Sequence, residues 1–131
     1  RGIVSNGPNA ASWANHSYTL KIDSTNIVQS VLNDTTGPAV CNGLTVLTAG
    51  RYYCVGLTYN FVNNIVYLDG RPDNSTAYTT ALTASVSATR IGSFRDGFFM
   101  LGRIGEVFVI SLPLSSVEMR NIYLATKWRY Q

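Results

Sequence analysis

The sequence is poor in charge. Asp, Glu, Lys and Arg make up 13% of its 131 residues, whereas soluble domains average about 25%. Uncharged polar residues take their place, since 12 Ser, 13 Thr and 11 Asn account for 36 positions. Such a surface is polar without being ionic. It is common on extracellular and virion surfaces, and on faces that are buried against other subunits.

Long apolar runs and clusters of basic residues are also lacking. No stretch approaches the roughly 18 apolar residues of a membrane span, so we expect no membrane insertion. The net charge of +3 comes from arginines spread along the chain, whereas nucleic-acid binding usually shows as a clustered basic patch. We therefore expect no nucleic-acid partner. With 46% hydrophobic residues the chain is not disordered.

The length suits one domain over residues 1–131, because two would each be too small for a good core. The chain begins at Arg1 without a visible signal peptide, and we expect it to be a piece of a longer product. Its two cysteines, Cys41 and Cys54, and its single histidine, His16, are too few for a closed zinc site with four ligands. The cysteines are expected to be free thiols, with a disulfide as the alternative.

Catalytic patterns are missing, and we expect no enzyme. Retaining glycosidases need two carboxyl groups about 5 Å apart, but Glu106 has no carboxylate two or four residues away. Glu118 is expected to cap a helix. His16 stands in a polar segment, where we expect a solvated loop residue, and neither a G-x-S-x-G elbow nor a phosphate-binding glycine loop occurs.

Alternation of apolar and polar residues dominates the chain and predicts short strands. We expect strands at 17–23, 26–33, 51–59, 64–69, 90–93 and 103–111. Turn residues separate them, and Asp69-Gly70 is the strongest turn signal. Many short strands with regular turns favour an antiparallel β-sandwich or a barrel.

One short C-terminal helix is predicted after Leu114. Ser115 with Glu118 three residues later forms the pattern of a capping box. Met119, Ile122 and Tyr123 then recur at helical spacing, which indicates core packing, and the helix is expected to end near Thr126.

Several segments occur in an order that resembles a known family. Residues 49–60 (AGRYYCVGLTYN) are similar to a strand G-x-W…V-T-Y-D, and residues 65–70 (IVYLDG) resemble a following L-Y-V-D-G hairpin strand. Residues 91–93 with 99–112 resemble I-G…F-x-G-x-I-D-E-V-x-I, and residues 113–128 resemble its closing helix. Together they are similar to the laminin-G-like, concanavalin-A-like lectin/glucanase jelly rolls of bacterial, environmental and phage surface proteins.

This resemblance implies that Val55, Leu57 and Tyr59 line the inside of a sandwich and face Val107 and Val109 from the other sheet. The sequence departs from the family pattern at two motif positions, with Tyr52 in place of Trp and Gly105 in place of Asp. The family's first two strands would lie upstream of Arg1. Their lack would leave a sheet edge bare, and bare edges recruit partners.

Two ligands are considered because the family binds them. Glycans need exposed aromatic rings beside planar hydrogen-bonding groups, and the candidates are Trp13, Asn15, His16, Tyr59 and Asn60. Calcium needs several oxygen ligands, and the candidates are Asp69 and Asp96 in loops. The alternative for each residue is a structural role in a loop or at the core edge.

The sequence therefore predicts a non-catalytic surface, structural or adhesion module at an extracellular or virion location. A virion role, such as capsid decoration or a tail fibre, is the leading hypothesis, with other copies of the chain or another protein bound at the exposed edge. A carbohydrate-binding module of a larger secreted protein is the alternative.

Overall fold

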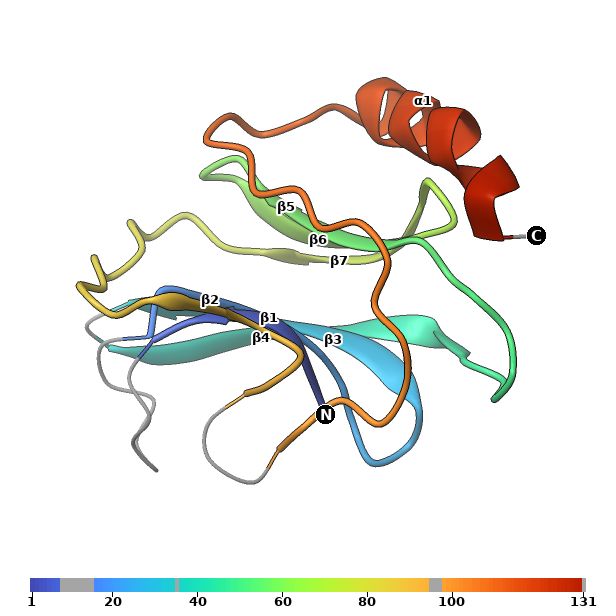
Figure 1. Cartoon of the computed structure of the whole chain (residues 1–131). Coiled ribbons are helices and arrows are strands. Elements are labelled where there is room, and N and C mark those ends of the chain that lie inside the picture. The colour runs from blue at the N-terminus through green and yellow to red at the C-terminus, as the bar shows by residue number, and fades with distance from the viewer. Residues whose placement is uncertain (8–15, 35, 95–97, 131) are drawn as a thin grey trace.

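The computed structural model describes residues 1–7, 16–34, 36–94 and 98–130. Two antiparallel sheets are stacked on one another (Figure 1), which confirms the predicted all-β sandwich. The larger sheet has the order β4-β3-β2-β1-β8 and the smaller one the order β5-β6-β7. The strands are β1 (Gly2–Asn6), β2 (Tyr18–Ile22), β3 (Ile27–Asp34), β4 (Gly37–Val46), β5 (Val55–Tyr59), β6 (Asn63–Leu68), β7 (Arg71–Ala77) and β8 (Thr89–Ile91).

The chain ends in the predicted helix, α1 (Ser116–Thr126), followed by a short 3₁₀ helix, η1 (Lys127–Tyr130). Ser115 and Glu118 form the predicted capping box. No helix in the described ranges is long and apolar enough to cross a membrane.

Figure 1 shows α1 on the side of the smaller sheet that faces away from the larger sheet. This position explains why neighbouring residues of β6 are both buried although their side chains point to opposite faces. Val66 packs in the core between the sheets, and Tyr67, 1% exposed, has its hydroxyl 3.3 Å from Ser116 Oγ at the start of α1.

The core lies between the sheets and centres on Leu20, Val28, Cys41 and Val66. A buried polar contact crosses the same space, where Ser30 Oγ on β3 donates to Asn64 Oδ1 on β6 at 2.7 Å. Both cysteines are free thiols, with Cys41 buried and Cys54 half-buried.

Strands with clean alternation were predicted well, whereas β1 and two strands rich in turn residues, β4 and β7, were not predicted. β4 contains Gly37, Pro38 and Gly43, and β7 begins with Arg71-Pro72, which are residues typical of turns. Both are edge strands of their sheets. An edge strand tolerates proline because one side of its backbone needs no ladder hydrogen bond.

The predicted strand at 103–111 is wrong. The segment pairs with no strand among the residues that the structure describes. Val109, which was expected to face the core, is 62% exposed. The run has the composition of a strand, but a strand also needs a partner in register, and the described chain places none beside it.

Candidate functional site

A large apolar groove lies between the two sheets. It is bounded by β5, by the inner face of β1 and β2 and by residues 100–114, and its cavity volume is about 1650 Å³. Small-molecule sites usually measure roughly 300–1,000 Å³. The groove is therefore larger than a usual ligand pocket.

Exposed apolar side chains line this groove. Seven large hydrophobic residues on its walls are 46% to 78% exposed: Tyr52, Phe61, Leu101, Phe108, Val109, Ile110 and Leu112. Soluble monomers rarely expose a contiguous apolar patch of this kind, and larger patches mark interaction sites. We call the cavity and these seven residues the open groove.

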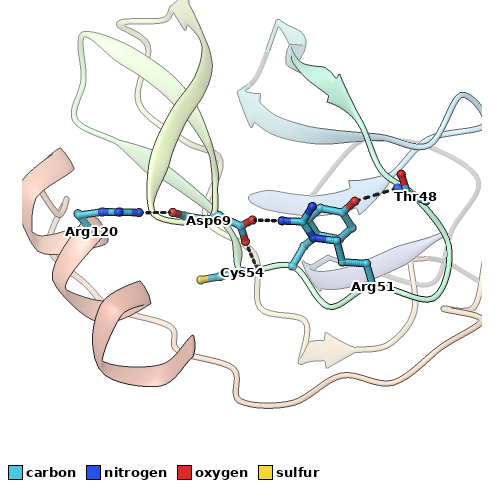
Figure 2. Close-up of polar contacts among 6 residues, drawn as sticks. Thr48, Arg51, Cys54, Asp69 and Arg120 are labelled. Atoms are coloured by element: carbon cyan, nitrogen blue, oxygen red, sulfur yellow. Dashed lines mark hydrogen bonds and ion pairs between the residues drawn. The ribbon is translucent and has the colours of Figure 1, made fainter. Parts of the chain in front are cut away.

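A polar network at the Asp69-Gly70 turn lies beside the open groove (Figure 2). Both turn residues have positive φ, 50° and 73°, as a two-residue type I′ hairpin requires. Asp69 Oδ1 accepts from the Cys54 amide at 3.0 Å, and Asp69 Oδ2 lies 3.4 Å from Arg51 Nη2. The Asp69 carbonyl accepts from Arg120 Nη1 at 3.0 Å, which ties helix α1 to the turn.

The network also explains two perturbed side chains. Burial, and then the negative charge of Asp69, raise the pKa of the Cys54 thiol, so this cysteine is a poor nucleophile at neutral pH. The hydrogen bond from the Thr48 amide, at 3.0 Å, lowers the pKa of Tyr53. Neither change indicates an acid–base pair, and the contacts of Asp69 hold the turn in place.

The structure does not test whether the two predicted calcium residues lie together. Asp69 has the structural contacts above, and Asp96 lies outside the described residues. In the described ranges no three His, Cys, Asp or Glu side chains form a cluster that could hold a metal ion. Calcium binding at Asp69 and Asp96 stays a prediction.

Of the first group of glycan candidates, Trp13 and Asn15 lie outside the described residues. His16 is 1% exposed, so the expectation of a solvated loop residue is wrong. Its ring lies 5.9 Å from that of Phe94, and a Cβ at Gly7 would overlap the imidazole. The lack of a side chain at Gly7 makes room for His16, which sequence spacing does not show.

The second group of glycan candidates lies at an aromatic cluster. The ring of Tyr59 is 5.0 Å from that of Phe61 and 5.4 Å from that of Tyr78. Phe61, at the tip of the β5–β6 hairpin, is 62% exposed and has a positive φ of 62°. Asn60 Oδ1 accepts from the Val62 and Asn63 amides, which fixes the tip. We call Tyr59, Phe61 and Tyr78 the aromatic cluster.

The sequence pattern pointed to Tyr59 and Asn60, but not to Phe61 and Tyr78. Phe61 follows Asn60 directly, and an aromatic residue at a polar hairpin tip is a sequence signal that could have identified it as a binding candidate. Tyr78 directly follows β7, and only the pairing of β6 with β7 brings it close to Tyr59. Its hydroxyl donates to Asp34 Oδ2 at 2.9 Å, and burial, followed by this hydrogen bond, raises its pKa.

Comparison with protein-family models and with curated protein sequences gave no match. Among solved structures, the chain is similar to an S-layer domain-containing protein (residues 221–444) from Clostridium thermocellum, with a TM-score of 0.54 and 17% sequence identity. The likeness covers 86% of this chain and 58% of that fragment. At this identity the comparison shows a shared β-sandwich fold.

Proposed function

We propose that this chain is a non-catalytic structural module of an extracellular assembly, with a virion surface (capsid decoration or tail fibre) as the leading setting and a cell surface layer as the other. The open groove carries the proposal. Exposing apolar side chains to water on this scale costs free energy unless another surface covers them. In an assembly, a neighbouring subunit covers such a groove. The shared fold with a protein named for its S-layer domain supports an extracellular place.

The contacts of the two glutamates support a module without catalytic chemistry. Glu106 forms an ion pair with Arg129, and Glu118 accepts from the Ser115 amide at 2.7 Å in the capping box. Both glutamates therefore have structural roles.

The order of elements also supports a type of sandwich. The β5–β6 hairpin, the Asp69-Gly70 turn and the capped helix follow in the order of a laminin-G-like jelly roll, and we propose that this sandwich is of that type.

Native mass spectrometry of the particle that contains the chain tests the proposal. The expected result is a large assembly in which the chain has a fixed stoichiometry. A chain that is released from its source free of any partner or assembly would contradict it.

A second candidate function is carbohydrate binding at the aromatic cluster. Sugar rings stack on exposed aromatic faces, and Phe61 presents such a face beside Tyr59 and Asn60. We expect the chain to bind members of a glycan array and to lose this binding in Phe61→Ala. The matched control is Phe99→Ala, because Phe99 is 61% exposed and lies outside the cluster. Equal loss in both variants, or a blank array, would remove this candidate.

A further inference from the structure

The two sheets differ in width, and the difference lies on one side of the sandwich. The larger sheet has five strands and the smaller one three. β4 and β7 meet at one side, where Asp73 on β7 accepts from the Leu44 amide on β4 at 2.9 Å. On the other side, in the described chain, β5 has β6 as a neighbour and no strand beyond it. The inner faces of β1 and β2 open there into the open groove.

Residues 101–112 cross this open side (Figure 1) as an extended but unpaired segment. In the described chain their backbone takes part in no ladder, and the Glu106 amide donates to the Tyr130 hydroxyl at 3.1 Å. The run from Val107 to Ile110 is β-branched or aromatic throughout, the composition that favours strands. A segment with these properties gains backbone hydrogen bonds and apolar burial when a second strand pairs with it.

The apolar area is large enough for a stable interface. The seven exposed residues of the open groove offer on the order of 700 Å² of side-chain surface, at about 100 Å² each. Specific interfaces of standard size bury about 800 Å² per partner. Residues 101–112 contain one Arg and one Glu, so two identical segments meet without net charge repulsion.

We propose that the open groove is the interface between two copies of this chain, in which the 103–111 segments pair as antiparallel strands around a two-fold axis. An isologous contact uses the same surface on both copies, and a two-fold axis across a strand makes identical segments antiparallel. Each new strand then covers the apolar wall of a groove and gives the backbone of its partner segment the hydrogen bonds that it lacks in the described chain. This inference rests on the proposed assembly function and names the partner.

The oligomeric state of the full 131-residue chain tests the proposal. Light scattering behind size-exclusion chromatography is expected to give about twice the 14.3 kDa of one chain. Hydrogen exchange followed by mass spectrometry is expected to show slow amide exchange in residues 107–111, because pairing protects backbone amides.

Ile110→Asp is expected to weaken the dimer roughly 30-fold or more, the effect of losing a central interface residue, and to speed exchange in 107–111. Ile110 is 50% exposed in the single chain, so the fold is expected to survive, and circular dichroism checks this. Val86→Asp is the matched control, since Val86 is fully exposed and does not line the groove. A wild-type monomer at micromolar concentration, or equal weakening by both variants, would overturn the proposal.

The result is separable from that of the proposed function. The purified chain could be monomeric and still have a fixed stoichiometry in a native particle. That result would contradict the self-pairing but support the assembly role, with another polypeptide in the groove. A dimer that belongs to no larger particle would support the self-pairing and contradict the assembly role.

Discussion

Asp73 on β7 and Thr45 on β4 are joined by a hydrogen bond of 2.6 Å from the threonine hydroxyl to Oδ1. The second carboxylate oxygen accepts from the amides of Leu44 and Thr45 at 2.9 and 3.2 Å. One carboxylate therefore links the edges of the two sheets by three hydrogen bonds. We call these three hydrogen bonds the polar seal. The polar seal closes the side of the sandwich opposite the open groove, so one side of the molecule is closed and the other is open.

Asp73→Ala is expected to lower the free energy of unfolding by about 1.5–3 kcal/mol, the usual range for hydrogen bonds to a charged group. Asp73→Asn keeps one acceptor oxygen and is expected to lose less. Urea denaturation at neutral pH measures both. If Asp73→Ala has the stability of the wild type, the seal contributes nothing.

The seal also makes a specific demand on Gly43. A Cβ at this position would overlap Asp73 Oδ2 and lie 3.1 Å from the Val28 carbonyl. We expect Gly43→Ala to destabilise the protein by about 1–3 kcal/mol, and by less when Asp73 is already alanine, because the main clash is then gone. Urea denaturation of the single and double variants measures this coupling. Additive effects would show that the two residues act independently.

The Asp34 carboxylate predicts a pH dependence. The hydroxyl of Thr36, then its amide, then the Tyr78 hydroxyl hold the pKa of Asp34 at about 2, below its ordinary 3.8. A lowered pKa in the folded state stabilises the protein above pH 3.8, and this contribution is lost as the pH falls towards 2. Asp34→Asn is therefore expected to lower Tm at pH 7 and to differ little from the wild type at pH 2.

Thermal denaturation at both pH values checks this expectation. Tyr78→Phe removes one of the donors to Asp34 and serves as the control, with a smaller loss of Tm at pH 7. A gap between wild type and Asp34→Asn that stays constant from pH 7 to pH 2 would mean that the charge of Asp34 is not the stabilising feature.

Gly70 has two reasons to be glycine, and a matched glycine separates them. Its φ is +73°, and an added Cβ would lie 2.6 Å from Tyr123 Cβ and 3.1 Å from Arg120 Cα in α1. Gly50 has a φ of +82° and nothing within 4 Å. Both alanine variants carry the backbone strain of roughly 1–3 kcal/mol, and only Gly70→Ala also displaces α1.

We therefore expect Gly70→Ala to destabilise more than Gly50→Ala in urea denaturation. Hydrogen exchange is expected to rise in α1 for Gly70→Ala alone. Equal destabilisation by the two variants would show that α1 shifts to make room for the added Cβ without lowering the free energy of unfolding.

Local sequence patterns predicted much of the fold. Alternation placed β2 and β3, the Asp-Gly pair placed the β6–β7 turn, and Ser115 with Glu118 placed the start of α1. These features depend on residues close in sequence, whose side chains decide the backbone geometry by themselves. The sites were less predictable, because the aromatic cluster needs Tyr78, which directly follows β7, and the turn residues at the start of β7 concealed that strand.

The sequence by itself determined a polar, weakly charged β-sandwich with one capped helix, because composition, alternation and capping act over a few residues. Only the tertiary structure decided that His16 is buried, that Asp73 seals one side and that residues 103–111 stay unpaired. Each of these depends on which strand lies beside or across from which. The apolar run at 103–111 has the side chains of a strand, but a strand exists only where a neighbour takes up its backbone hydrogen bonds.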